Sequence, residues 1–158
     1  MTSQWHSLIS QKVFLAKTLL SERDRQASTP IQEALFQGAV ELSLRSRQLL
    51  LVMLARMYQD KQNMPVSINE LRNLLGGTAP EIDELEALET NTKSWWAYLD
   101  QVADHQTRPP KAKKTISDDN IIAVSVDNGP DRSSKALVQA LDHLKNFTDA
   151  LAERHSEW

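Results

Sequence analysis

"PIQEALFQGAVELSLRSRQLLLVMLARMYQDK", residues 30–61, is the stretch that decides the expected fold. Pro30 suits the first turn of a helix, where a backbone N–H would have no partner anyway, and Thr29 is expected to cap that helix. Apolar side chains then recur at helical spacing in two stripes. The first comprises Ile31, Leu35, Gly38, Leu42, Leu49, Val52 and Met53, and the second comprises Phe36, Val40, Leu44, Leu51, Leu54 and Tyr58. A helix that is apolar on two sides is expected at the centre of a bundle.

The segments on both sides of this stretch also have helical patterns. Apolar residues at spacings of three and four predict helices over residues 3–25, from Pro80 through Val102, and over residues 132–154. Ser67 and Glu70 have the spacing of a capping box, so a short helix is expected over residues 68–75. The glycines at 76 and 77 are expected to end it, because glycine readily adopts the backbone conformation found after helices.

Two adjacent tryptophans, Trp95 and Trp96, lie within "SWWAYLDQV", residues 94–102. Neighbouring side chains on a helix point about 100° apart, so both cannot occupy the centre of one apolar stripe. The spacing from Leu88 to Leu99 predicts that Trp95 is buried and that Trp96 lies at the boundary. An exposed aromatic platform for a ligand is the alternative.

The helical pattern disappears in "QTRPPKAKKTISDD", residues 106–119, which predicts a Pro/Lys-rich linker. "NIIAVSVDN", residues 120–128, is short and β-branched, so we expect an extended, strand-like segment there. A lone strand needs partners for its backbone groups, either within the chain or in a second copy. Its predicted interface residues are Ile121, Ile122, Val124 and Val126. The expected fold is one all-α domain over residues 1–158: an antiparallel bundle of four main helices, plus one short helix and one extended segment.

Composition narrows the possible functions. The chain has 158 residues, of which 41% are hydrophobic and 25% are charged, as in ordinary soluble globular proteins. A net charge of −3 disfavours a nucleic-acid binder, although Arg108, Lys111, Lys113 and Lys114 in the linker are candidate phosphate contacts. The chain contains no cysteine, which excludes disulfides and thiolate metal sites. Neither a signal peptide nor a membrane span is recognisable, so a cytoplasmic protein is expected.

The motifs of common catalytic sites are missing from the sequence. There is no glycine-rich phosphate loop and no Glu-x-x-His ligand pair, so no catalytic residue, metal or cofactor is predicted. The candidate ligand-binding residues are Glu41, Arg45 and Trp96. Glu41 and Arg45 are spaced for an ion pair on the surface of the helix, or for a polar site inside the bundle that binds a small ligand or supports hydrolysis.

The leading hypothesis is a non-enzymatic protein that binds a protein partner or itself. The long helix has more apolar surface than one neighbour covers, and the segment 121–126 offers an unpaired backbone. A symmetric homodimer would bury both features.

Five segments together resemble a known family. They are "SQKVFLAKTLL" (10–20), "EALFQGAVELSLRSRQLLLVML" (33–54), "SWWAYLDQV" (94–102), "NIIAVSVD" (120–127) and the terminal "HSEW" (155–158). In this order they resemble an uncharacterised family of small bacterial helical proteins, a domain of unknown function. The resemblance implies a mostly helical single domain, and no activity or catalytic residue carries over from it.

Overall fold

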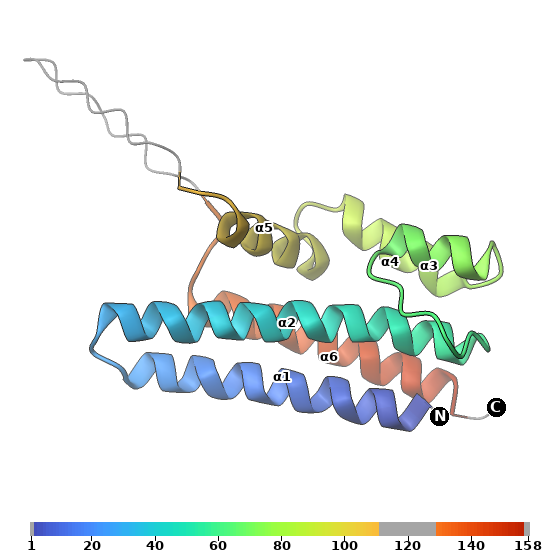
Figure 1. Ribbon diagram of the computed structural model, residues 1–158, viewed down its shortest axis with the longest axis horizontal. Helices are drawn as coiled ribbons and strands as arrows, with labels where there is room; N and C mark the ends of the chain where they lie inside the picture. Colours follow the sequence, from blue (N-terminus) through green and yellow to red (C-terminus); the bar gives the residue numbers. More distant parts are fainter. Residues whose placement is uncertain (1, 111–128, 157–158) are drawn as a thin grey trace, which may run out of the picture.

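A computed structural model describes residues 2–110 and 129–156, and this part of the chain contains helices and no strand (Figure 1). The six helices are α1 (Thr2–Arg25), α2 (Thr29–Met57), α3 (Ile68–Leu75), α4 (Pro80–Thr90), α5 (Trp95–Thr107) and α6 (Ser134–Arg154). The all-helical expectation is confirmed. The expected strand-like segment, with Ile121, Ile122, Val124 and Val126, lies outside the described residues.

The helices form two layers (Figure 1). Helices α1, α2 and α6 lie side by side, and α3, α4 and α5 lie across one side of them. Helix α1 packs on α2 and α6, whereas α5 packs on α2 and α6 from the second layer. The start of α1 and the end of α6 lie at the same end of the molecule.

Helix α2 is central, as its two apolar stripes predict. It contacts α1, α3, α5 and α6, and Phe36, Leu50 and Met53 are fully buried against them. Each such side chain contributes roughly 2 kcal/mol of hydrophobic stabilisation before the entropy cost. The apolar surface of α2 is therefore largely covered within the chain, which removes one of the two features behind the expected homodimer.

The boundaries of α2 differ slightly from those expected. Its N-cap is Ser28 rather than Thr29, and the helix ends at Met57, with Tyr58 as C-cap, instead of running through residue 61. Gln59 adopts a φ of 70°, which stops the helix. The Asp60 carboxylate then accepts the backbone N–H groups of the two following loop residues, 62 and 63.

The helix expected from Pro80 through Val102 is two helices, α4 and α5. Asn91 Oδ1 accepts the backbone N–H of Lys93, and Ser94 Oγ accepts that of Ala97 at 3.0 Å. Short polar side chains that bond nearby backbone groups compete with a continuing helix, so the chain turns here and α5 starts anew. The sequence predicted one continuous helix because apolar residues keep their helical spacing across this break.

This break decides where the tryptophans lie. Both are buried, with exposed fractions of 9% for Trp95 and 3% for Trp96, so the expected boundary position of Trp96 is wrong. Trp95 packs on Phe147 of α6, with ring centroids 5.9 Å apart. The alternative of an exposed aromatic platform is excluded by the same burial.

Local capping signals elsewhere gave the correct boundaries. Ser67 Oγ accepts the N–H of Glu70 at 3.1 Å, and the Glu70 carboxylate accepts the N–H of Val66, so the capping box forms at α3. Gly76 ends α3 with a φ of 65°. Ser133 caps α6 in the same manner as Ser67 caps α3.

Candidate functional site

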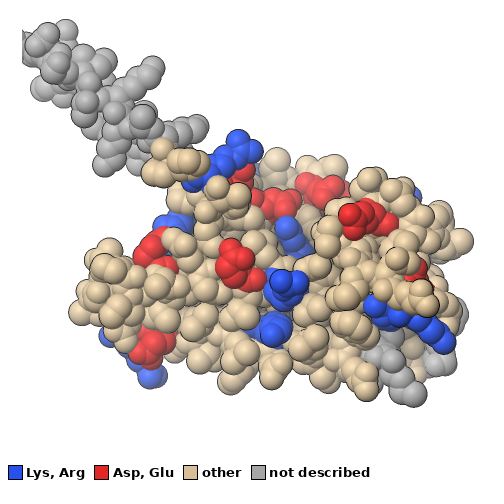
Figure 2. All heavy atoms as spheres, in the orientation of Figure 1, with Lys and Arg blue, Asp and Glu red and all other residues tan. Residues whose placement is uncertain are grey.

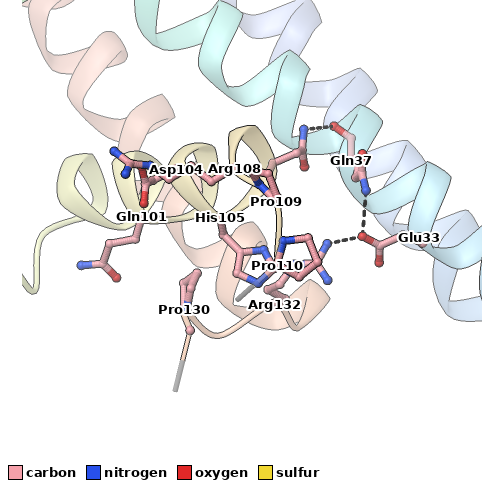
Figure 3. A pocket seen from close by; sticks show the side chains of 12 residues that line it. Glu33, Gln37, Gln101, Asp104, His105, Arg108, Pro109, Pro110, Pro130 and Arg132 are labelled. Carbon is pink, nitrogen blue, oxygen red and sulfur yellow. Dashed lines mark hydrogen bonds and ion pairs between the residues drawn. The ribbon is translucent and has the colours of Figure 1, made fainter. Parts of the chain in front are cut away.

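A cavity of about 740 Å³ lies between the first half of α2, the end of α5 and the start of α6 (Figure 3). It is lined by Glu33, Gln37, Gln101, Asp104, His105, Gln106, Arg108, Pro109, Pro110, Gly129, Pro130 and Arg132. Its size is in the range of small-molecule sites. Like the site predicted from the sequence, it borders the long second helix and includes charged side chains, but its residues are different.

The charged side chains of this cavity are paired with one another. Arg132 donates to Glu33, which also accepts from Gln37 Nε2 at 2.9 Å, and Arg108 Nε donates to Asp104 at 2.6 Å (Figure 3). The hydrogen bond from Arg132 holds the pKa of Glu33 below its ordinary value. The lining thus has both donors and acceptors without a net charge, which suits a neutral or zwitterionic molecule better than a phosphate.

Arg132 is the most firmly positioned of these groups. Its guanidinium lies 4.7 Å from the centre of the Phe36 ring, and Arg23 lies 4.6 Å from the same ring. Two cation–π contacts therefore enclose Phe36, and Arg23 additionally donates to Ser134 Oγ at 3.1 Å. These contacts fasten the start of α6 to α1 and α2 and orient Arg132 toward Glu33.

The predicted residues Glu41, Arg45 and Trp96 do not come together in one site. Glu41 accepts from Gln106 Nε2 at 2.8 Å, and Arg45 donates to Gln48 at 2.8 Å, both on the exposed side of α2. No ion pair joins Glu41 to Arg45 in the described structure. Trp96 lies elsewhere, in the second layer.

The cation that Trp96 meets is Arg47, two positions after Arg45. The Arg47 guanidinium lies 4.5 Å from the Trp96 ring centre, donates to the Trp96 carbonyl at 3.0 Å and pairs with Asp100 at 2.7 Å. Side chains two positions apart on a helix point about 200° away from each other. Arg47 therefore faces α5, while Arg45 faces solvent. Only the rotation of α2 against α5 distinguishes these two arginines, and the sequence does not state that rotation.

A second hollow, of about 340 Å³, surrounds this contact, and we call it the Trp96 groove. It lies over α2, between α5 and the segment that leads into α3. Its lining residues are Leu44, Arg47, Gln48, Leu51, Val66, Ser67, Ile68, Glu89, Trp96, Asp100 and Ala103. Because these residues come from four separate parts of the chain, sequence spacing could not reveal the groove.

The outer side of α1, which we call the α1 face, is a third candidate surface. Every exposed residue from Gln4 to Ser21 is uncharged: Gln4, Ser7, Gln11, Phe14, Leu15, Thr18 and Ser21. Two large apolar side chains of this face are exposed: Phe14, with an exposed fraction of 68%, and Leu15, with 40%. In Figure 2 the lower part of the surface, over the middle of α1, is mostly neither acidic nor basic. The helical spacing of these uncharged residues was readable in the sequence.

A buried carboxylate, Glu81, joins three helices at the end of the molecule where α1 starts and α6 ends. Tyr58 donates to Glu81 at 2.6 Å, and His155 Nε2 lies 3.0 Å from Glu81 Oε1. Burial opposes ionisation of Glu81, but the hydrogen bonds from Tyr58 and His155 outweigh it and lower its pKa. Burial and the adjacent carboxylate raise the pKa of Tyr58 to about 12. This group lines none of the cavities described above, so its evident role is to hold α2, α4 and α6 together.

Residues 2–110 and 129–156 contain no cluster of three or more His, Asp or Glu side chains arranged to hold a metal ion. No described helix is long and apolar enough to cross a membrane.

The sequence profile of one protein family matches residues 1–158, the full length of the chain. The chain belongs to DUF6586, a family of unknown function. This membership confirms the resemblance of the five sequence segments to a family of unknown function. No curated protein and no solved structure matches the chain. DUF6586 therefore supplies no activity, and function has to be argued from the surfaces of this molecule.

Proposed function

We propose that this DUF6586 protein is a non-enzymatic cytoplasmic protein that acts by self-association, forming a homodimer through the α1 face. The observation that carries the proposal is the uncharged exposed stripe from Gln4 to Ser21, with Phe14 at its centre and 68% exposed. Solvent-facing sides of helices usually carry charged residues, and a quarter of this chain is charged. An uncharged side with an exposed aromatic ring is typical of a protein interface.

The charge distribution favours a second copy of the chain as the occupant. In a two-fold symmetric contact a surface meets itself, so exposed charges on it would approach charges of the same sign. None of the exposed residues of the α1 face is charged, and the partly buried Lys17 beside them is paired with Asp142, so this repulsion is reduced. Burial of each Phe14 ring against the other copy would contribute roughly 2 kcal/mol.

The size of the contact indicates that part of α2 also takes part. The stripe from Gln4 to Ser21 is about 26 Å long, and a stable dimer buries roughly 800 Å² on each partner. One helix side supplies only part of that area. Gly38 of α2 lies against α1, because a Cβ added there would meet Leu19. Ile31 lies two turns before Gly38 on the same side of α2 and is 46% exposed, so it extends the apolar surface beside α1.

The test is the molar mass of the full chain by light scattering after size exclusion, at about 10–100 µM. We expect a dimer for the natural sequence and a monomer for Phe14→Glu, with unchanged helical circular dichroism. Gln139→Glu, an equal charge change at an exposed position of α6, is the matched control and should remain dimeric. A monomeric natural protein, or a dimer that survives Phe14→Glu, would refute the proposal.

The segment containing Ile121, Ile122, Val124 and Val126 remains a prediction as a further interface. The double substitution V124D/V126D tests it in the same measurement. If this variant is still a dimer, the α1 face is sufficient for dimerisation. If it is a monomer, this segment is part of the interface.

A second candidate function, small-ligand binding, is favoured by the 740 Å³ cavity of Figure 3. The described residues of its lining include no Ser, Thr, Cys or Lys nucleophile, so binding fits it better than covalent hydrolysis. Native mass spectrometry of freshly purified protein should then show an added small mass that is reduced by His105→Leu. His143→Leu on α6, also exposed, is the control. Protein without any added mass, together with no thermal shift from neutral and zwitterionic metabolite mixtures, would exclude this function.

A further inference from the structure

Exposed apolar side chains are concentrated on α3 and on the segment that leads into it. Met64 is 52% exposed, Val66 is 61% exposed and Leu74 is 37% exposed, and these are three of the six large apolar residues exposed among the described residues. Val66 borders the Trp96 groove, while Met64 and Leu74 line a separate hollow of about 320 Å³. Residues 63–65 line one hollow and residues 66–68 line the other. Each hollow has both apolar and polar side chains in its walls and can accept an apolar side chain of a bound chain.

The surroundings of both hollows are acidic. Residues 64–107, which form α3, α4, α5 and their connections, contain eight acidic and two basic residues. Six of these acidic residues pair with arginines, and Glu70 and Glu89 are the two that have no ion pair among the described residues. Acidic side chains gather over α5 and α4 on the face shown in Figure 2. Glu89 and Asp100 border the Trp96 groove, and Glu70 borders the second hollow.

Arg47, the one basic residue of the groove, does not offset this field. Asp100 and the Trp96 ring hold its guanidinium against the floor, and its side chain is only 16% exposed. Glu89, in contrast, is exposed and has no hydrogen-bond or ion-pair partner among the described residues. An incoming chain therefore meets partly apolar walls and the carboxylates of Glu89 and Glu70, neither of which has an ion-pair partner among the described residues.

We infer that the Trp96 groove and the adjoining hollow bind a basic amphipathic segment of a partner protein. Apolar side chains of that segment enter the two hollows, and its Lys or Arg side chains pair with Glu89 and Glu70. The α1 face of a second copy does not fit, because none of its exposed residues is basic and the partly buried Lys17 beside them already pairs with Asp142. Nucleic acid does not fit either, since its phosphates would face carboxylates. The inference is independent of the proposed dimer, which uses the opposite layer.

The first experiment compares two synthetic helical peptides of the same heptad pattern, one built from Leu and Lys and the other from Leu and Glu. Isothermal titration of each into the full chain should give micromolar binding of the Leu/Lys peptide and at least tenfold weaker binding of the Leu/Glu peptide. Equal binding of the two peptides, or binding of neither, would overturn the inference.

Matched variants then locate the site. Glu89→Lys is expected to weaken the Leu/Lys peptide about fivefold, and Val66→Ser should weaken it by a similar factor through lost apolar contact. Glu22→Lys makes the same charge change on exposed α1 and should have little effect. Equal weakening by Glu22→Lys and Glu89→Lys would show a merely long-range attraction and would refute the groove. Phe14→Glu should leave peptide binding unchanged, which separates this test from that of the dimer.

Discussion

Replacing Glu81 with glutamine tests how the end of the molecule is held together. The Glu81 carboxylate is 1% exposed and accepts from Tyr58 at 2.6 Å, with His155 at 3.0 Å and Arg154 at 3.6 Å. Glutamine has nearly the same shape and keeps an oxygen for the Tyr58 hydroxyl. It removes the negative charge that faces His155 and Arg154, so the substitution isolates the electrostatic part of the contact.

The magnitude follows from the burial of each partner. A buried hydrogen bond to a charged group contributes roughly 1.5–3 kcal/mol, whereas the half-exposed Arg154 adds well under about 1 kcal/mol because solvent screens it. We therefore expect Glu81→Gln to lower the free energy of unfolding by about 2 kcal/mol at pH 7. For a chain of this size that corresponds to a fall in Tm of roughly 4–8 °C.

The loss should depend on pH in one direction. The folded-state pKa of Glu81 lies below its ordinary value of 4.5, so the charge stabilises the fold fully above that value. The stabilisation disappears as pH falls through the folded-state pKa. The difference between the natural protein and Glu81→Gln should accordingly be constant from pH 7 to about pH 5.5 and shrink at lower pH.

Urea unfolding followed by circular dichroism, at several pH values, measures this difference. The control is Glu84→Gln on the same helix, since Glu84 pairs with Arg154 at 3.2 Å but is 44% exposed, and it should change stability by less than about 0.5 kcal/mol. Equal effects of the two substitutions at pH 7, or a difference that grows toward low pH, would refute the reasoning.

Two further substitutions test local backbone features. Gly76→Ala should lower the free energy of unfolding by about 1–2 kcal/mol, because Gly76 has a φ of 65° that an alanine rarely adopts. Gly77→Ala is the control. It should be nearly neutral in the same urea titration, because no atom lies within 4 Å of the added Cβ. Ser94→Ala should lower the free energy of unfolding by about 1 kcal/mol, because it removes the cap of α5. Thr92→Ala, at an exposed position of the same loop, is the control. Equal Tm values for the two variants would contradict the role of the cap.

The sequence predicted well wherever the decisive interaction is local. The capping box of Ser67 and Glu70, the stop at Gly76 and the central position of α2 all depend on residues a few positions apart, and each is present in the structure. The break between α4 and α5 is equally local, and Ser94 with Asn91 was the available signal. It was overridden because the apolar spacing happens to continue across the turn.

The candidate sites were predicted less well, since they combine distant segments. Glu41 and Arg45 share a helix side by spacing, but nothing in the spacing shows that this side faces solvent. The Trp96 groove needs α2, α5 and the α3 segment at one place, and the Figure 3 cavity needs α2, α5 and α6. The α1 face is different, because its uncharged stripe lies on one helix and could have been read directly.

By itself, the sequence determined the helices, most of their ends and the central place of α2, because periodicity and capping act within a few residues of the chain. Tertiary structure alone decided the partners of the charged side chains. It placed Arg47 rather than Arg45 over Trp96, and it buried Glu81 while leaving Asp83 of the same first turn exposed. Such choices depend on how each helix is rotated against neighbours from distant parts of the chain, and that rotation is set by the packing of the whole core.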